Sequence, residues 1–244
     1  MNIVRLSFCT FTQLIIFNMK QFLQSIFFIT FFSNSLFGQI SEGHISYKIS
    51  TSTDNPELQM VISMMQGSTM DVYFSKDKTR SEMTMGAMMS VVTISNNSTD
   101  EILLLMGGMM GQKAMKSKLS EMASNQDDSI PKPVVTLVDE TKEIQGFKCK
   151  KAVLTDSEGV ESIYWYTTEI EIAKKGQTYL NDQIPGFPME FDLNNNGIKM
   201  TMIVQEFEKK LDRKKIDSLF EMKIPEGYET ISQEDLMNGS LGGN

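Results

Sequence analysis

Apolar and polar residues alternate one for one along much of this chain, and this pattern constrains the fold most. The segment 44–51 reads HISYKIST, with an apolar residue at every second position, and the segment 69–75, TMDVYFS, repeats the pattern. Since successive side chains of a strand point to opposite faces, a period of two predicts strands that bury one face and expose the other. The chain is therefore expected to build a sheet with one apolar face.

The same pattern continues along the rest of the chain. Turn signals separate several of the segments, and Asn196-Gly197 between two apolar runs is typical of a two-residue hairpin turn. Short turns of this kind join neighbouring antiparallel strands. We expect further strands at 79–86, 89–95, 101–107, 111–116, 134–138, 142–154, 160–167, 187–193 and 198–209.

Two helices are predicted among these strands. Asn55 is suited to cap a helix, Pro56 fits its first turn and Gly67 ends it, and the segment 116–124 is expected to form a second helix. The simplest assembly is a mainly β (α+β) fold. We expect a curved antiparallel meander sheet that forms an open half-barrel, with one or two helices packed on its apolar face.

The N-terminal segment has the layout of a secretory signal peptide. Met19-Lys20 opens a basic start, followed by an apolar run and then small and polar residues up to Gly38. We expect the true start at Met19, cleavage after Gly38, a single domain over 39–237 and a disordered Gly-rich tail over 238–244. The protein is accordingly expected to be soluble in the periplasm.

Charge and cysteine content exclude several classes of function. Removal of Arg5 and Lys20 with the signal peptide would take the net charge from −8 to −10. An acidic surface repels phosphate backbones, so we expect no nucleic-acid partner. Cys149 would then be the only cysteine, which leaves no internal disulfide. We expect a monomer without a cofactor.

Residues suited to catalysis are sparse. The only histidine, His44, falls on the polar face of the first strand, which favours a surface role over that of a general base. Cys149 shares a strand face with apolar residues, which favours a buried, inert thiol. The segment 192–200, DLNNNGIKM, matches half of a calcium loop but has Ile203 at the twelfth position, so a hairpin turn is favoured. We therefore expect no catalytic residue, and a protein that is not an enzyme.

Methionine is unusually frequent, with 20 residues in the chain and dense runs at 83–89, MTMGAMM, and 103–115, LLLMGGMMGQKAM. Flexible thioethers fill irregular cores, line surfaces that accept varied apolar ligands, and bind soft metals such as Cu(I). Ordinary packing, an apolar pocket and a metal site all remain open, and no metal-binding residue is singled out. The residues expected to line an apolar ligand site are Phe74, Met83, Met85, Met106, Met109 and Met110.

Four segments of the second half carry a family resemblance. TKEIQGFKCKKAVL (141–154), IYWYTTEI (163–170), IPGFPMEFDL (184–193) and LFEMKIPEGYETIS (219–232) resemble the exported Bacteroidetes domain-of-unknown-function family 4412. The element Pro185-Gly186-Phe187-Pro188 is also similar to the related GLPGLI-type proteins. The resemblance implies a LolA/LolB-like architecture for 39–237, in which an open half-barrel holds acyl chains. It implies no site residue.

The leading hypothesis is therefore an exported, non-enzymatic periplasmic protein. It would bind an apolar small molecule, a lipid or a lipoprotein acyl chain, in a half-barrel lined by methionine. Two alternatives remain: a soft-metal protein that binds Cu(I) or Ag(I) through its methionine clusters, and a structural or assembly factor with a cell-envelope protein as its partner.

Overall fold

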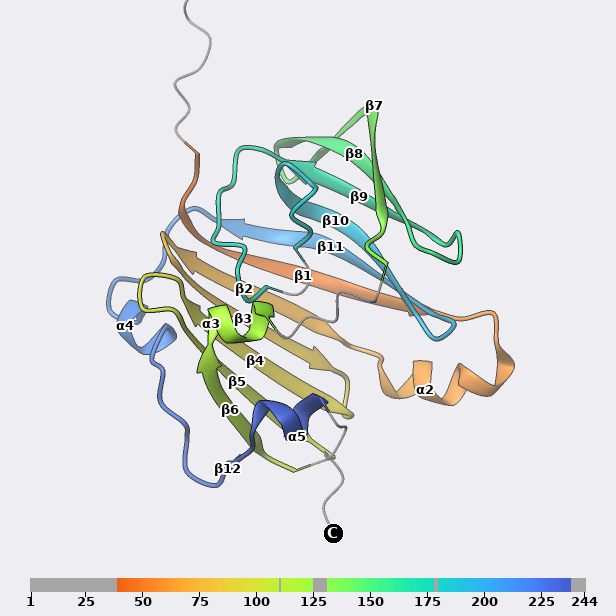
Figure 1. Cartoon of the computed structure of the whole chain (residues 1–244). Coiled ribbons are helices and arrows are strands. Elements are labelled where there is room, and N and C mark those ends of the chain that lie inside the picture. The colour runs from red at the N-terminus through yellow and green to blue at the C-terminus, as the bar shows by residue number, and fades with distance from the viewer. Residues whose placement is uncertain (1–38, 110, 125–130, 178–179, 238–244) are drawn as a thin grey trace, which may run out of the picture. The chain divides into compact units, whose positions relative to one another are not determined.

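In a computed structural model, residues 39–109, 111–124, 131–177 and 180–237 are described, and they belong to one compact unit that begins at Gln39. Strands dominate this unit (Figure 1). They are β1 (Glu42–Ser52), β2 (Thr69–Ser75), β3 (Lys78–Met85), β4 (Met89–Asn96), β5 (Glu101–Gly108), β6 (Lys113–Lys118), β7 (Val134–Ile144), β8 (Phe147–Thr155), β9 (Glu161–Thr167), β10 (Phe187–Asn195), β11 (Ile198–Glu208) and β12 (Glu229–Thr230).

All of these strands join one open, curved sheet of 12 strands in the order β12-β6-β5-β4-β3-β2-β1-β11-β10-β9-β8-β7. The strands β1 to β6 form one meander and β7 to β11 form a second, and the two meanders meet where β1 pairs with β11. Every pairing is antiparallel except that of β12 with β6. The prediction of a mainly β fold built on a curved, open antiparallel sheet is confirmed.

One expected strand is a hairpin instead. The segment 142–154 contains the end of β7 and all but the last residue of β8, joined at Gln145 (φ 51°) and Gly146 (φ 79°). Two consecutive residues with positive φ match the right-handed twist of a two-residue hairpin. The turn expected at Asn196 (φ 48°) and Gly197 (φ 78°) has the same conformation and is confirmed.

The helices are short. The predicted N-terminal helix begins as a 3-10 turn, η1 (Pro56–Leu58), and continues as α2 (Gln59–Met64), with the Asn55 side chain accepting a bond from the Glu57 N–H. The second predicted helix is α3 (Leu119–Ser124), preceded by strand rather than helix at 116–118. Two more helices, α4 (Ile216–Leu219) and α5 (Gln233–Met237), follow the last long strand. Within the described residues, no helix has the length and apolar character needed to cross a membrane.

The main core lies on one face of the sheet, called here the core face and marked by Val72 and Phe74, both fully buried. The described parts of the β9–β10 connection (168–177 and 180–186) pack on this face near α3 (Figure 1). Gln177 from this connection donates a hydrogen bond to the Ser95 hydroxyl on β4, at 3.2 Å. The Leu119 side chain of α3 is buried beside Gly176. The connection and α3 therefore cover part of the curved face from which an open hollow was expected.

A second, smaller core lies on the opposite face, called the outer face. Paired residues of adjacent strands share a face, and Tyr73, Arg80 and Ile94 are paired in one row across β2, β3 and β4. Ile94 belongs to the smaller core, so this core and the row lie on the same face. Its other members are Leu103, Leu105 and Ala114, and the C-terminal segment covers them with Met222, Ile224 and Tyr228.

Candidate functional site

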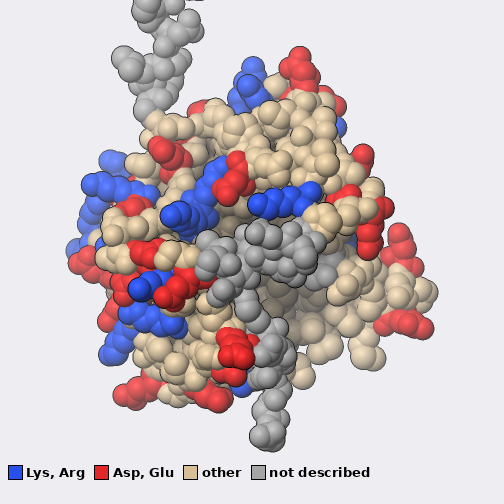
Figure 2. All heavy atoms as spheres, viewed as in Figure 1, with Lys and Arg blue, Asp and Glu red and all other residues tan. Residues whose placement is uncertain are grey.

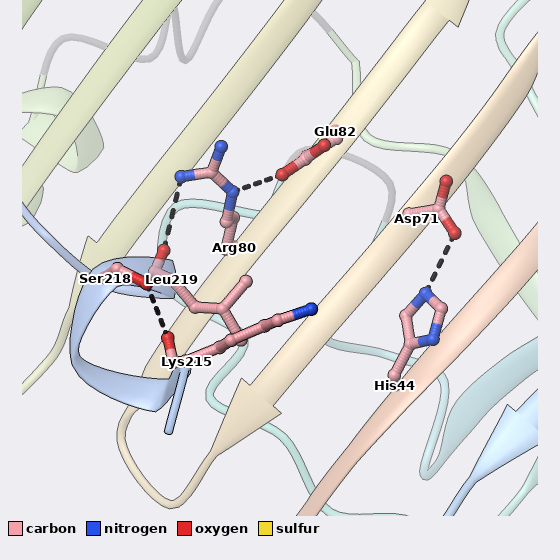
Figure 3. A network of polar contacts seen from close by, with 7 residues as sticks. All are labelled: His44, Asp71, Arg80, Glu82, Lys215, Ser218 and Leu219. Atoms are coloured by element: carbon pink, nitrogen blue, oxygen red, sulfur yellow. Dashed lines mark hydrogen bonds and ion pairs between the residues drawn. The ribbon is translucent and has the colours of Figure 1, made fainter. Parts of the chain in front are cut away.

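A cluster of polar side chains lies on the outer face beside the smaller core (Figure 3). It consists of His44 from β1, Asp71 and Tyr73 from β2, and Arg80 and Glu82 from β3, and is called here the polar cluster. Strand register brings the five together, because Tyr73 pairs with both His44 and Arg80 while Asp71 pairs with Glu82. The site is therefore carried by three neighbouring strands in the middle of the sheet.

Ion pairs and ring stacking order the polar cluster. His44 Nε2 lies 2.9 Å from Asp71 Oδ1, and the imidazole stacks on the Tyr73 ring with centroids 4.3 Å apart and planes at 7°. Arg80 Nε donates to the Glu82 carboxylate, and Arg80 Nη1 donates to the Leu219 carbonyl at the end of α4, at 3.2 Å (Figure 3). These contacts between protein groups hold the side chains of the cluster in place.

The polar cluster offers hydrogen-bond donors and acceptors next to a flat aromatic surface. Burial, followed by the Asp71 carboxylate, raises the pKa of Tyr73 above its ordinary value, so the phenol keeps its proton to a higher pH than a free tyrosine and can donate a hydrogen bond. The two carboxylates accept hydrogen bonds, and the guanidinium donates them. Figure 2 shows the side of the molecule on which α3 lies in front of the sheet, where acidic and basic side chains are intermingled around uncharged areas. The polar cluster itself combines acceptors, donors and an aromatic surface, so it suits a ligand rich in hydroxyl groups better than a strongly charged one.

His44 lies on the outer, polar face, as its sequence position predicted, and is half-buried there. No group of three or more histidine, cysteine, aspartate or glutamate side chains suited to a metal ion occurs in the described part of the chain. Asp192, considered as a calcium ligand, accepts from the Thr201 hydroxyl at 2.7 Å and pairs with Lys199 at 3.0 Å across the Asn196-Gly197 hairpin. The hairpin interpretation of this segment is confirmed.

A second polar group surrounds Trp165 on β9. The Lys142 and Lys151 ammonium groups lie 4.6 and 5.7 Å from its ring centroid. Each lysine is also held by a carboxylate, Lys142 by Glu190 at 2.6 Å and Lys151 by Glu140 at 3.0 Å. Because both cations are already paired and lie against the ring, this group is a cation–π contact that ties β7, β8, β9 and β10 together.

Cys149 is fully buried, as predicted, and burial raises the pKa of its thiol to about 11. We expect a thiol reagent to modify it in the folded protein only as the pH approaches 11, because the thiolate is the reactive form. In urea the same residue should react from about pH 8.5, the ordinary thiol pKa. Mass spectrometry of the Cys149 peptide measures this difference, and rapid native labelling at pH 8 would show an accessible thiol instead.

The residues expected to line a ligand site do not form one group. Phe74 is fully buried in the main core, and Met83 is partly buried and packs against that core. Met83 and Met106 flank Val91 in a row across β3, β4 and β5, whereas Met109 is 74% exposed beyond the end of β5. Met85 is half-buried at the end of β3, and Met110 lies outside the described residues. Their role as ligand contacts stays a prediction.

The residues of the polar cluster other than His44 were not predicted from the sequence. Their signal was the polar half of the alternating segments TMDVYFS and KTRSEM, which places Asp71, Tyr73, Arg80 and Glu82 on the face opposite the core. The alternation shows that these side chains share a face. It does not show which of them are paired, since that depends on the register between strands.

The fold and the polar cluster define a class of protein: a mainly β domain with its main core on one face of an open sheet and an ordered polar site on the other. The chain belongs to the family described as "N-glycanase peptide, N-terminal domain", whose model matches residues 45–224. This match covers well over half of the chain and includes β2 to β11 with most of β1. Among curated proteins, no sequence matches this chain.

Three solved structures are similar to this chain. Two structures of PNGF-II, in the C2 and P21 space groups, share 16% and 18% identity with this chain and give TM-scores of 0.46 and 0.48. Each alignment covers 82% of this chain, but only 32% and 33% of the PNGF-II chains, so this chain spans about a third of their length. A LolA superfamily protein from Nitrosomonas europaea shares 9% identity over 72% of this chain and 90% of that chain, with a TM-score of 0.20. All three TM-scores are below 0.5, so the family assignment rests on the sequence match.

The family corrects several expectations drawn from the sequence. The resemblance to family 4412 and the GLPGLI-type proteins, and the LolA/LolB-like architecture that it implied, are wrong, because the chain matches the N-glycanase domain family over residues 45–224. The hypothesis of a protein that binds a lipid or acyl chain is overturned by the same match. The expectation that the chain is not an enzyme conflicts with a family of glycanase domains. The soft-metal and envelope-assembly alternatives gain no support.

Proposed function

We propose that this chain acts in the removal of N-linked glycans from proteins, as the N-terminal domain of an N-glycanase. The family match over residues 45–224 is the observation that carries this proposal. The chain spans only about a third of the PNGF-II chains, so we assign it one role in the activity and not the whole reaction. That role is contact with the carbohydrate of the glycoprotein substrate.

The polar cluster is where we place this contact. A sugar presents hydroxyl groups that must exchange water for protein hydrogen bonds, and side chains that are already ordered make this exchange at a lower entropic cost. Asp71 and Glu82 supply carboxylate acceptors, and Arg80 supplies guanidinium donors. The stacked rings of His44 and Tyr73 add a flat surface for the apolar face of a sugar ring.

Export is a further part of the proposal. Residues 19–38 have the layout of a signal peptide, and N-linked glycoproteins are met outside the cytoplasm. We propose that the chain is cleaved after Gly38 and functions in the periplasm or beyond it. N-terminal sequencing of protein recovered from the native host would test this, and a first residue at Met1 or Met19 would contradict it.

Binding to a glycopeptide tests the proposed contact. The full chain should bind a peptide with one N-linked glycan and should not bind the same peptide without it, as measured by isothermal titration calorimetry. Asp71→Asn and Glu82→Gln should each weaken binding by about 10-fold or more, since a hydrogen bond to a charged group contributes roughly 1.5–3 kcal/mol.

The matched control is Glu158→Gln, which removes an exposed carboxylate from the β8–β9 turn. This variant should bind the glycopeptide as the parent protein does. Fluorescence of Trp165, the only tryptophan, would verify that each variant is folded. Equal binding of the glycosylated and bare peptides, or no binding of either, would contradict the proposal.

A further inference from the structure

A pocket of about 210 Å³ is lined mainly by the β9–β10 connection, and none of its lining residues belongs to the polar cluster. Three segments surround it: the N-terminal end of the described chain at Gln39, the segment 168–174 and the segment 180–187. Ile40 and Ile170 form an isolated parallel bridge, in which the Ile40 N–H donates to the Glu169 carbonyl at 2.8 Å. In return, the Glu171 N–H donates to the Ile40 carbonyl at 3.0 Å. Backbone hydrogen bonds therefore hold two walls of the pocket together.

The third wall is fixed to the second. The Lys174 ammonium group donates to the Ile184 carbonyl at 2.9 Å. Gly186 lies so close to the end of β9 that an added Cβ would be 2.4 Å from the Thr167 carbonyl oxygen. The pocket is thus bounded by segments that contacts within the protein hold together.

The lining is divided between apolar and polar groups. Ile170, Leu180 and Phe187 supply apolar side chains, and the first and last of these are almost fully buried. The polar residues of the lining are Gln39, Thr168, Glu171 and Lys174. The Gln39 amide donates to the Thr168 carbonyl at 3.1 Å. Pockets for drug-sized ligands measure about 300–1,000 Å³, so this smaller pocket suits a single sugar residue or one of its substituents.

We propose that this pocket binds the acetamido group of an N-acetylhexosamine. An acetamido group combines a methyl group with an amide, and these match the apolar and the polar parts of the lining. The methyl group would pack against Ile170, Leu180 and Phe187, while the amide would exchange hydrogen bonds with the Gln39 side chain and the Thr168 hydroxyl. The choice of sugar rests on the proposed function, because N-linked glycans contain N-acetylhexosamine.

The pocket is a second carbohydrate site, separate from the polar cluster. The cluster lies on β1, β2 and β3, whereas the pocket is built from the connection that follows β9 and from Gln39. The polar cluster offers charged groups for hydroxyls, whereas the pocket also offers apolar side chains. The pocket would therefore select the type of sugar, and the cluster would contact sugars through their hydroxyl groups.

A pair of disaccharides that differ in the acetamido groups tests the proposal. N,N′-diacetylchitobiose and cellobiose have the same linkage, but only the first carries acetamido groups. With the full chain, we expect binding of diacetylchitobiose to be about 10-fold or more tighter, the range for a methyl-sized group in an apolar pocket. Saturation-transfer NMR should show the strongest transfer at the acetamido methyl.

Thr168→Trp is the variant that tests the location. Thr168 is exposed at the rim, so a bulky ring there should block the pocket without disturbing the core, and it should abolish the preference for diacetylchitobiose. Thr141→Trp places the same ring at an exposed threonine on β7 and should leave the preference unchanged. Equal binding of the two disaccharides, no binding of either, or an unchanged preference in Thr168→Trp would overturn the proposal.

The glycopeptide experiment separates this proposal from the proposed function. If Asp71→Asn abolishes glycopeptide binding but the chain shows no preference between the disaccharides, the polar cluster is supported as a carbohydrate site and the pocket proposal is wrong. If the disaccharide preference depends on Thr168 but the chain does not bind the glycopeptide selectively, the pocket proposal is supported and the proposed function is wrong.

Discussion

Replacement of Phe74 by alanine should lower the free energy of unfolding by about 3–5 kcal/mol, the usual cost of removing a fully buried phenylalanine ring. Phe74 is completely buried on β2, where it pairs with Gly43 on β1 and Thr79 on β3. The ring packs against Gly43, since a Cβ added there would be 3.1 Å from Phe74 Cζ. Neighbouring backbone on both sides prevents the site from collapsing around the cavity.

Urea unfolding followed by Trp165 fluorescence measures this change. Met109→Ala is the control from the same set of sequence-predicted residues, and it should change stability by no more than about 0.5 kcal/mol, because Met109 is 74% exposed. A loss below about 1 kcal/mol in Phe74→Ala would indicate that the ring faces an open hollow. The pair of variants therefore separates core residues from surface residues among the six that the sequence singled out.

The alternation of residues was sufficient to predict the sheet, because side-chain period is a local property of a strand. It correctly placed Val72 and Phe74 on the buried face and His44 on the polar face. It failed at 142–154, where Gln145-Gly146 lacks the asparagine that marks the Asn196-Gly197 turn. Local signals thus located the strands and missed a turn with a weaker sequence preference.

The features that position the sites depend on contacts between distant residues. The β9–β10 connection has no periodicity that would show where it packs, yet Gln177 reaches Ser95 on β4 and Ile170 bridges Ile40. The polar cluster likewise requires the register of β1, β2 and β3, which fixes the pairing of His44 with Tyr73. A long irregular connection can cover a sheet without any pattern that reveals it in the sequence.

The segment Pro185-Gly186-Phe187-Pro188, which suggested a different family, has a structural explanation in this chain. Gly186 allows the chain entering β10 to approach the end of β9, and the next residue, Phe187, pairs with Thr167. A glycine at a close backbone approach is a geometric requirement that unrelated β proteins share. A short motif of this kind is therefore weak support for a family, whereas the match over 45–224 uses most of the chain.

The same close approach makes Gly186→Ala a strongly destabilising change, expected to cost about 1–3 kcal/mol, as for other insertions into packed regions. The added Cβ would be 2.4 Å from the Thr167 carbonyl oxygen and 2.7 Å from Tyr166 Cδ2, so backbone must move. Since Gly186 also lines the pocket, the preference for diacetylchitobiose should fall in the same variant.

Gly107→Ala is the matched control for this prediction. Its added Cβ would meet only the Ser90 hydroxyl, at 2.8 Å, and that side chain is free to rotate away, so the cost should stay below about 1 kcal/mol. Urea unfolding of both variants measures the difference. Equal losses of unfolding free energy in the two variants would show that the backbone before β10 shifts as easily as a serine side chain. A pocket wall that shifts so easily could not be shaped for one chemical group.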